Sequence, residues 1–408
     1  MLSVEEALVR LLAALPVTDH ETIKVESALG RVLAEPLSAP FDSPAFANSS
    51  MDGFAVQATD ISAASPEMPI LLRVVGDIPA GMASPKSLDP GQAMRIMTGA
   101  PLPDGADTVV PVEDTDVENR GPNAPLPGQV AIHRALDAGT YVRPVGQDFS
   151  SGRQLLPAGA RLAPQHVALL AMLGLADVSV HRKPRVALFS SGDELLQPGQ
   201  PLGPGQIYES NSFSLAALLQ DLGADVIHLG IARDNLEEIK RFLDRAVGEG
   251  ADLIITSAGV SVGAHDYLRD ALQSNGDLDF WRVNMRPGKP LAFGNYDGVP
   301  YIGLPGNPVS AFVSFEVFGR PALQKMSGVS AWRRLAIRAK LEEEVASDGR
   351  QSYLRATLDD QKEGFYTNLT GHQGSGNLYS LVQANCLIVI PAGVKYLEAG
   401  SMVEAWPL

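Results

Sequence analysis

The feature that most constrains the fold is an alternation of apolar strand-like runs and amphipathic helix-like segments after residue 184. Such alternation predicts a parallel sheet with helices on both faces. We therefore predict an α/β multidomain protein with a central, doubly wound, mostly parallel sheet. Ligands of such sheets bind beyond the carboxyl ends of the strands. The expected strands are 186–189, 225–229 and 253–256, and the expected helices are 211–222, 234–247 and 266–272.

The flanking regions have other patterns. Residues of about 45–144 form short β-like runs broken by Gly and Pro, which predicts a β-rich lobe inserted into a helical and linker region made of residues 1–44 and 145–181. After residue 327 the alternating runs fit a small barrel or sandwich, and we predict a C-terminal β-barrel. The predicted domains are therefore 1–181, 182–327 and 328–408.

Composition excludes several classes of protein. The 408 residues carry a formal charge of −15, which argues against a nucleic-acid partner because phosphate backbones are bound by clustered Lys and Arg. The single cysteine, Cys386, can form neither an internal disulfide nor a thiolate metal site. The N-terminus begins with a capping box (Ser3, Glu6) and an amphipathic helix rather than a basic segment and a long apolar run. We expect a cytoplasmic protein without a membrane partner.

A strand, a loop of small residues and a helix follow one another from Asp252 to Tyr267. Loop amides together with a helix N-terminus can bind a phosphate without a basic side chain. Because no Gly-Lys-Ser/Thr follows, the loop is not that of an ATPase. A plain strand-to-helix connection is the open alternative. The candidate substrate-binding residues of this loop are Gly259, Val260, Ser261 and Gly263.

Acidic residues follow the predicted strands. Glu194, Asp234 and Asp266 would converge on one edge of the sheet, next to Arg286 and Lys289. Carboxylates beside an anion loop suit Mg²⁺, which would bridge them to phosphate oxygens. Each acid has a structural alternative, since Asp234 with a Glu three residues later also fits a helix cap.

Two further candidates lie in the β-rich lobe and one in a glycine-rich loop of the C-terminal domain. Asp52 precedes a strand at an Asp-Gly turn, and Thr98 occupies a compact loop. Either residue also fits a simple turn. Ser375 stands in the glycine-rich loop and offers a hydroxyl to an oxyanion.

Several short motifs, taken in order along nearly the whole chain, resemble the bacterial molybdopterin molybdenumtransferase family, called MoeA, to which the gephyrin E domain is related. Each motif alone is weak, but together they are specific. They are Ser50-Met51-Asp52-Gly53-Phe54-Ala55, Met97-Thr98-Gly99-Ala100-Pro101, Ser191-Gly192-Asp193-Glu194-Leu195, Gly259-Val260-Ser261-Val262-Gly263 with Asp266-Tyr267, Pro287-Gly288-Lys289-Pro290, Leu304-Pro305-Gly306-Asn307-Pro308-Val309-Ser310 and Gln373-Gly374-Ser375-Gly376.

The resemblance implies an Mg²⁺-dependent transferase of molybdenum cofactor biosynthesis. Its substrates are molybdate and adenylylated molybdopterin, AMP leaves, and molybdenum is inserted. Family members are homodimers in which the β-rich lobe of one subunit faces the sheet domain of the other, so the active site is shared. A MogA-like adenylyltransferase is a further expected partner. By position, the implied catalytic residues are Asp52, Thr98, Glu194, Asp234 and Asp266, the metal ligands are Glu194, Asp234 and Asp266, and the substrate-binding set adds Arg286, Lys289, Pro305, Pro308 and Ser375 to the loop residues.

Departures from the family pattern leave two alternatives open. Ala258 replaces a common glycine, Ala264 replaces a frequent acid, and Arg286 replaces a usual lysine. One alternative is a MogA-like molybdopterin adenylyltransferase, since that family shares the central domain. The other is a non-catalytic cofactor-binding or scaffold paralogue, which the two alanines favour.

Overall fold

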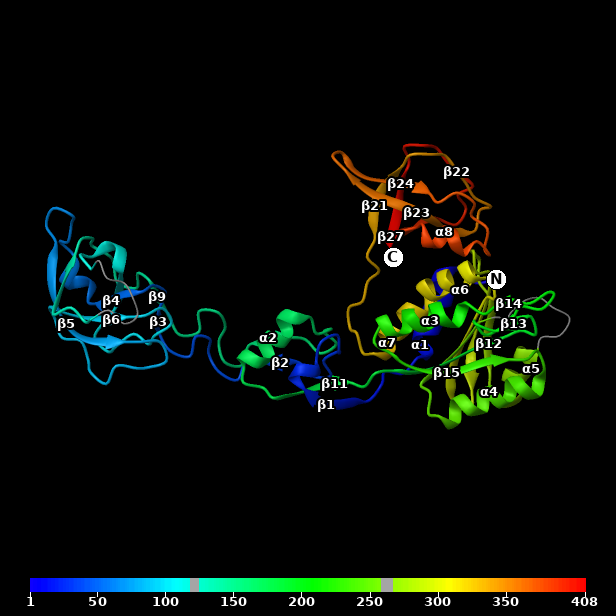
Figure 1. Ribbon diagram of the computed structural model, residues 1–408, viewed down its shortest axis with the longest axis horizontal. Coiled ribbons are helices and arrows are strands. Elements are labelled where there is room, and N and C mark those ends of the chain that lie inside the picture. The colour runs from blue at the N-terminus through cyan, green and yellow to red at the C-terminus, as the bar shows by residue number, and fades with distance from the viewer. Residues whose placement is uncertain (118–124, 258–266) are drawn as a thin grey trace. The chain divides into compact units, whose positions relative to one another are not determined.

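The computed structural model describes residues 1–117, 125–257 and 267–408. The chain divides into two compact units, which are treated separately below (Figure 1). One unit joins Met1–Glu35 to Pro157–Leu408, and the other is Pro36–Leu156. The predicted three-part division at residues 181 and 327 stays a prediction, because this grouping separates only the inserted part from the rest.

A six-stranded sheet is the centre of the larger unit. The first four strands in spatial order are parallel and the last two pairings are antiparallel. Strands buried on both faces need continuous apolar runs, and every residue of Leu253–Ser257 is buried. The doubly wound, mostly parallel sheet is thereby confirmed. Its strands in spatial order are β15 (Asp225–Ala232), β12 (Arg185–Ser191), β16 (Leu253–Ser257), β20 (Val299–Leu304), β19 (Pro290–Tyr296) and β17 (Leu278–Arg282).

Alternate residues of β12 point into two separate cores, because successive side chains of a strand lie on opposite faces. Val186 and Leu188 belong to one core, and Ala187 and Phe189 to the other. The helices on the first face are α1 (Val4–Ala14), α3 (Asn211–Asp221), α6 (Pro308–Ser314) and α7 (Arg320–Met326), the last two joined by the π-helical turn η4 (Phe315–Gly319). The helices on the second face are α4 (Leu236–Gly248) and α5 (Tyr267–Asn275).

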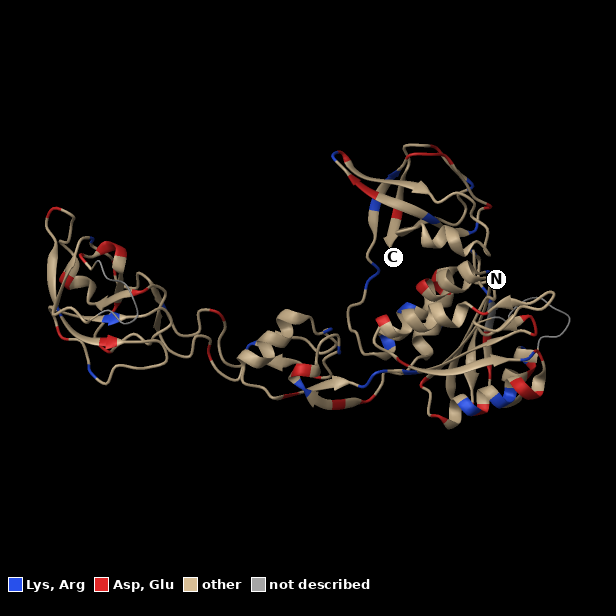
Figure 2. Ribbon diagram, in the orientation of Figure 1, with Lys and Arg blue, Asp and Glu red and all other residues tan. Residues whose placement is uncertain are grey.

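Helices α1 and α4 follow their sequence patterns. The predicted capping box of α1 is confirmed, because the Glu6 N–H donates to Ser3 Oγ at 3.1 Å and the Ser3 N–H donates to Glu6 Oε2 at 2.8 Å. Helix α4 buries its apolar stripe, and Figure 2 shows Lys, Arg, Asp and Glu together on its outer side. No helix among the described residues is long and apolar enough to cross a membrane.

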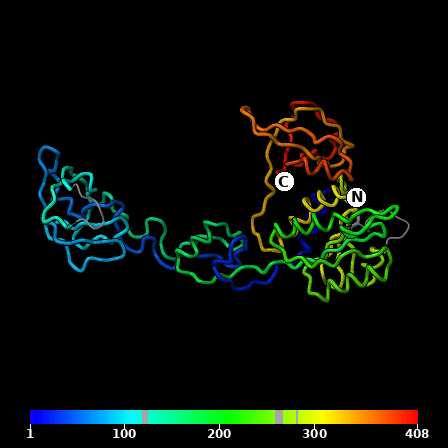
Figure 3. Tube along the Cα trace, viewed as in Figure 1, coloured from blue at the N-terminus to red at the C-terminus, as the bar shows by residue number. Residues whose placement is uncertain are grey.

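A small subdomain lies next in sequence to α1 and is completed by residues more than 130 positions later. Strands β1 and β11 pair antiparallel from His20↔His181 to Lys24↔Asp177. Figure 3 shows this N-terminal segment in blue beside the green segment that pairs with it. The elements are β1 (His20–Lys24), the 3-10 turn η1 (Val25–Ser27), α2 (Pro164–Met172) and β11 (Asp177–His181).

The unit Pro36–Leu156 is β-rich, as predicted, and its five-stranded sheet is mixed. Apolar residues on the two faces of this sheet form two cores, one around Phe54 and Ile61 and the other around Ile78 and Met94. The sheet strands are β7 (Thr108–Pro111), β4 (Gly53–Val56), β6 (Gln92–Ile96), β5 (Ile70–Ile78) and β8 (Gln129–Ile132). The shorter elements are β2 (Leu37–Ser38), β3 (Asn48–Ser49), η2 (Ala58–Ile61), η3 (Val112–Asp114), β9 (Val142–Arg143) and β10 (Gln154–Leu156).

The C-terminal residues form a closed five-stranded barrel, which confirms that prediction. The ring closes because the long strand β23 pairs with β24 through one half and with β25 through the other. The barrel strands are β21 (Ile337–Leu341), β23 (Gln351–Gln361), β24 (Gly364–Leu369), β25 (Cys386–Ile390) and β27 (Met402–Pro407). The short elements of the larger unit are β13 (Leu195–Leu196), β14 (Ile207–Tyr208), β18 (Met285–Arg286), β22 (Val345–Ala346), α8 (Leu378–Val382) and β26 (Tyr396–Leu397).

Candidate active site

A cavity of about 790 Å³ lies at the carboxyl ends of the parallel strands. The last residues of β12 and β16, Ser191 and Ser257, line it, as does Pro305 immediately after β20. This is where a doubly wound sheet binds its ligands. The barrel domain completes the wall with Arg350 and the loop that carries Ser375.

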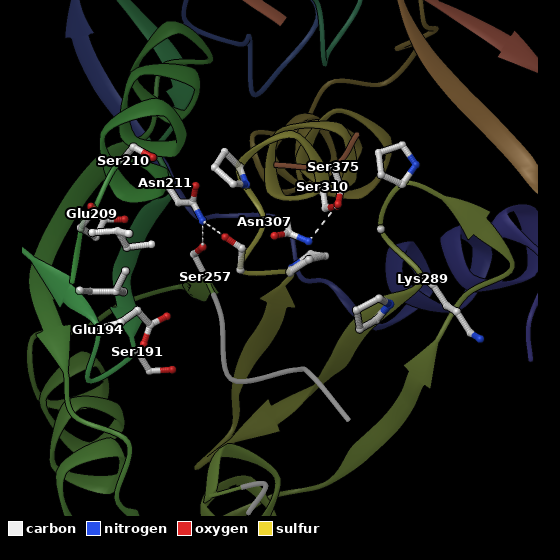
Figure 4. A pocket seen from close by; sticks show the side chains of 18 of the residues that line it. Ser191, Glu194, Glu209, Ser210, Asn211, Ser257, Lys289, Asn307, Ser310 and Ser375 are labelled. Carbon is white, nitrogen blue, oxygen red and sulfur yellow. Dashed lines mark hydrogen bonds between the residues drawn. The ribbon is translucent and has the colours of Figure 1, made fainter. Parts of the chain in front are cut away.

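The structure brings together many of the predicted site residues, which come from separate parts of the chain. Those that line the cavity are Glu194, Asp234, Arg286, Lys289, Pro305, Pro308 and Ser375. Figure 4 shows Glu194 on one side of it and Lys289 on the other. Gly259, Val260, Ser261, Gly263 and Asp266, together with Ala258 and Ala264, lie outside the described residues.

Asp52 and Thr98 belong to the unit Pro36–Leu156 and interact with each other. Asp52 Oδ1 accepts a hydrogen bond from the Thr98 N–H at 2.7 Å and another from Thr98 Oγ1 at 2.8 Å. Both residues are exposed. The acid therefore stabilises the approach of the loop after β6 to the turn before β4, and it also remains on the surface of the unit.

On the acidic side of the cavity, the negative charge of Asp234 is disfavoured by its surroundings. Asp234 is exposed as a residue, yet packing around its carboxyl group removes part of its hydration, and this burial raises its pKa. The negative charges of Asp193 and Glu194 raise that pKa further. Among the described residues, neither Glu194 nor Asp234 forms an ion pair with Lys or Arg, so a bound cation would relieve this repulsion.

The structural alternative for Asp234, the N-cap of helix α4, is wrong by one residue. Asn235 is the N-cap, and its side chain accepts a hydrogen bond from the Glu238 N–H at 2.9 Å. Asp and Asn are both strong N-caps, so the adjacent pair could not be separated by residue type. Because Asn235 provides the cap, the carboxylate of Asp234 is available to the cavity.

Two glycines, Gly192 and Gly288, allow close packing around residues of the cavity. A Cβ atom at Gly192 would lie 2.7 Å from Glu194 Oε2, so a side chain there would displace the Glu194 carboxylate. On the cationic side Gly288 has φ +102°, and a Cβ there would lie 2.3 Å from Ser314 Oγ. Only glycine permits this close packing of the turn between Arg286 and Lys289.

Arg350 is a third cation of the cavity that sequence patterns did not reveal. Its Nη1 donates to the Met285 carbonyl oxygen at 3.1 Å, and its Nε donates to Asp348 Oδ2 at 3.0 Å. The hydrogen bond from Arg350 lowers the pKa of Asp348. A lone Arg before a strand of a separate domain carries no local signal, because only the tertiary fold brings it to the sheet.

The loop of Ser375 is fixed from both sides. In the cavity, Asn307 Nδ2 donates to Ser375 Oγ at 2.9 Å, and the Val309 N–H donates to the Ser375 carbonyl oxygen at 3.1 Å. Asn307 occupies the predicted N-cap position of α6 but makes no capping hydrogen bond with its side chain. Its amide instead joins the sheet domain to the barrel loop.

Behind this loop lies the fully buried Arg355. Its guanidinium donates to three successive carbonyl oxygens, those of His372 at 3.4 Å, Gln373 at 3.3 Å and Gly374 at 3.0 Å. Burial and, to a smaller extent, the charge of Arg286 lower the pKa of Arg355 to about 10. Because these carbonyls face Arg355, the loop is held from within the barrel.

Two buried polar residues of the cavity wall were also missed. Glu209 is 3% exposed and accepts hydrogen bonds from Ser190 Oγ at 2.9 Å and the Ser212 N–H at 2.8 Å. Asn211 is 8% exposed and donates to Ser257 Oγ and to the Gly306 carbonyl oxygen, each at 2.7 Å. A signal was present, since polar residues open α3 beside the carboxyl end of the sheet, but the same pattern fits an ordinary helix start.

Within the described part of the chain, no group of three or more His, Cys, Asp or Glu residues is arranged to hold a metal ion. Among the described residues, the acids that line the cavity are Glu194, Asp234 and Glu209, and Glu209 is already engaged by Ser190 and Ser212. Mg²⁺ is commonly held by one or two carboxylates with substrate oxygens and water. A site of that kind fits Glu194 and Asp234 better than a dedicated protein cage.

Three family models cover almost the whole chain. Residues 2–174 match the MoeA N-terminal region (domain I and II). Residues 187–325 match a probable molybdopterin binding domain, and residues 338–408 match the MoeA C-terminal region (domain IV). The cavity is lined mostly by the second of these regions, with a contribution from the third.

Full-length relatives agree. The chain is 42% identical over 394 residues to molybdopterin molybdenumtransferase 2 of Mycobacterium tuberculosis, covering 95% of each protein. It is 40% identical over 393 residues to the molybdopterin molybdenumtransferase of Nostoc sp., covering 94% of this chain and 88% of the relative. The solved molybdopterin biosynthesis moeA protein from Pyrococcus horikoshii OT3 is similar over 100% of both chains, at 28% identity and a TM-score of 0.84. The chain therefore belongs to the MoeA family, the family that its sequence motifs resemble.

Proposed function

We propose that this protein is a molybdopterin molybdenumtransferase of molybdenum cofactor biosynthesis, which combines molybdate with adenylylated molybdopterin and releases AMP. The observation that carries the proposal is the charge distribution of the 790 Å³ cavity, with Glu194 and Glu209 on one side, Lys289 on the other, and Arg286 and Arg350 also in its lining. A nucleotide-linked pterin has neutral rings and several phosphate charges. Such a ligand needs a cavity of this size with cations in its lining.

The cations have a direct role in the reaction. Cleavage of the phosphoanhydride adds an oxygen of water or molybdate to phosphorus while the bridging oxygen leaves with its electron pair. Molybdenum insertion forms two Mo–S bonds, and the two thiol protons leave with one molybdate oxygen as water. Cleavage of the anhydride concentrates negative charge on oxygen, which Arg286, Lys289 and Arg350 are placed to stabilise. The Ser375 hydroxyl, held by Asn307, is placed to orient an oxyanion.

Mg²⁺ fits the acidic side. The raised pKa of Asp234 reflects burial and two neighbouring negative charges, both of which favour a bound cation. Glu194 and Asp234 would hold the ion, with Asp266 as the further proposed ligand outside the described residues. When bound, Mg²⁺ neutralises charge on the phosphate oxygens. The protein residues themselves would fix the nucleotide against the cations.

The rest of the site is proposed from the family resemblance. The loop residues Gly259, Val260, Ser261 and Gly263 would bind phosphate oxygens. Asp52 and Thr98 would come from the β-rich lobe of a second subunit, in a cytoplasmic homodimer with a shared active site. Pro305 and Pro308 would shape the wall beside Ser375, and a MogA-like adenylyltransferase would supply the substrate.

The two alternatives are now less favoured. Similarity that extends through the N-terminal and C-terminal MoeA regions supports a transferase rather than a MogA-like adenylyltransferase. A non-catalytic scaffold has less need of Asp234, whose charge is disfavoured by burial and by the neighbouring Asp193 and Glu194. The substitutions Ala258 and Ala264 still motivate a direct test.

That test uses purified protein, adenylylated molybdopterin, Mg²⁺ and molybdate, with AMP as the measured product. We expect AMP release that requires both molybdate and the divalent cation. Formation of adenylylated molybdopterin from ATP would instead identify an adenylyltransferase. Tight nucleotide binding without turnover, in the presence of molybdate and Mg²⁺, would identify a scaffold and overturn the proposal.

A further inference from the structure

The orientation of the Asn211 amide is fixed by its neighbours. Its Nδ2 lies 2.7 Å from the Gly306 carbonyl oxygen and 2.7 Å from Ser257 Oγ (Figure 4). A carbonyl oxygen only accepts hydrogen bonds, so the amide nitrogen must face Gly306. The Asn211 carbonyl oxygen, Oδ1, therefore points away from these two partners.

That oxygen lacks a partner. Asn211 Oδ1 is buried and accepts no hydrogen bond from any residue that the structure describes, although Asn211 is only 8% exposed. Leaving a buried amide oxygen without a donor is unfavourable, so native proteins satisfy such atoms with a protein group, a water molecule or a ligand. Because Asn211 lines the 790 Å³ cavity, a bound ligand is able to provide the missing donor.

The neighbouring groups restrict which part of a ligand binds there. Glu209 and Glu194 lie on the same side of the cavity in Figure 4, and both present carboxylate oxygens. Ser190 and Ser212 already donate to Glu209, so they do not serve Asn211. Phosphate and molybdate carry few protons at neutral pH, so they do not supply the donor that Asn211 Oδ1 lacks. N–H and O–H groups do.

We propose that Asn211 is a specificity residue whose Oδ1 accepts a hydrogen bond from an N–H or O–H of the neutral part of the ligand. This inference rests on the proposed function, and it places a donor-bearing ring or the ribose at Asn211. The donor belongs either to the adenosine part or to the pterin part, and both present this chemistry.

Calorimetric titrations with matched ligands separate these sources. The adenosine series is AMP and three analogues that each lack one donor group of AMP, namely 2′-deoxy-AMP, 3′-deoxy-AMP and purine riboside 5′-monophosphate. The pterin pair is 6-hydroxymethylpterin and its 2-desamino analogue. We expect wild-type affinity to fall about tenfold, equivalent to about 1.4 kcal/mol, for the analogue that lacks the donor bound by Asn211. The series in which the loss occurs identifies the source.

The variant Asn211→Ala shows whether Asn211 causes that discrimination. It also loses the bonds to Ser257 and Gly306, but this structural effect weakens a ligand and its analogue equally and cancels in their ratio. We therefore expect Asn211→Ala to bind the two members of the critical pair with equal affinity. The matched control is Asn307→Ala, which removes a different amide from the cavity and should keep the tenfold ratio.

Three outcomes overturn the inference. An unchanged ratio in folded Asn211→Ala assigns the discrimination to another residue. Equal wild-type affinities across both series exclude a donor bond at Oδ1 without any need for the variant. Wild-type protein that binds neither AMP, the pterin nor adenylylated molybdopterin contradicts the proposed function itself, and the inference fails with it.

Discussion

Asp52 in the inserted unit and Asp234 in the sheet domain have opposite environments. In the inserted unit, Asp52 accepts two hydrogen bonds from Thr98, at 2.7 and 2.8 Å. In the sheet domain, burial and the charges of Asp193 and Glu194 raise the pKa of Asp234. The first carboxylate is stabilised by its neighbours, whereas the second is destabilised by them.

This difference indicates what each acid contributes to the protein when no ligand is bound. A carboxylate that accepts hydrogen bonds from the chain contributes to the fold. Carboxylates that repel one another reduce stability, and such groups cluster at sites where a ligand or cation relieves the repulsion. Asp52 thus has a structural role that needs no ligand, while Glu194 and Asp234 have none that is evident.

The largest expected effect tests the repelling acids. We expect Glu194→Gln and Asp234→Asn each to lower molybdate-dependent AMP release by about 100-fold or more, because each removes a charge that would hold Mg²⁺. Neither variant should lower the melting temperature, since each removes repulsion. The measurements are AMP release at saturating substrate and calorimetric melting without Mg²⁺.

The control for these variants is Glu237→Gln, which removes an exposed acid from the first turn of α4. It should retain full activity. If Glu194→Gln and Asp234→Asn melt well below wild type, the two acids are structural, and the contrast with Asp52 disappears.

A smaller effect separates the two roles of Asp52. Asp52→Ala removes the acceptor for both Thr98 hydrogen bonds and should lower the free energy of unfolding of the inserted unit by about 1 kcal/mol. Asp52→Asn keeps an oxygen acceptor and should leave that stability near wild type. If Asp52 also acts in a shared active site, both variants should lose about 10-fold or more in AMP release.

Asp52→Asn is the informative member of this pair, because it removes the charge and keeps the turn. Full activity in Asp52→Asn would restrict Asp52 to its structural role. Denaturant unfolding and AMP release are both measured on full-length Asp52→Asn. Together they give its stability and its activity.

The sequence predicted those features that depend on local periodicity. Strands buried on both faces, as in Leu253–Ser257, show continuous apolar runs, and the capping box at Ser3 and Glu6 is a local signal. The predicted α/β sheet, β-rich lobe and barrel follow from such patterns. Local signals failed where two residues compete for one position, as Asp234 and Asn235 do at the start of α4.

The composition of the site was predictable only in part. Motifs located Glu194, Lys289 and Ser375, and the expected edge of the sheet located Asp234 and Arg286; all five line the cavity. Arg350 and Asn211 carry no comparable signal, because their importance depends on contacts with Met285 and Gly306, far away in sequence. Such long-range contacts are set by the tertiary fold rather than by the periodicity of a segment.

The smallest expected effect is a pH-dependent difference in stability between wild type and Asp234→Asn. Because the folded-state pKa of Asp234 is raised above 3.8, its protonated form contributes stability below the unfolded-state pKa, and this is lost as the pH rises through the folded-state pKa. Asn cannot ionise and loses nothing. Asp234→Asn should therefore melt above wild type at pH 7, by roughly a few degrees at most, and the difference should shrink toward pH 4.

Mg²⁺ sharpens the same measurement. A cation that binds only the folded protein raises its melting temperature, so Mg²⁺ at pH 7 should stabilise wild type more than Asp234→Asn and reduce the gap between them. Calorimetric melting at pH 4, 5.5 and 7, with and without Mg²⁺, gives both dependences. A gap that stays constant with pH would show that the neighbours of Asp234 do not repel its charge, and Asp52 and Asp234 would then be alike.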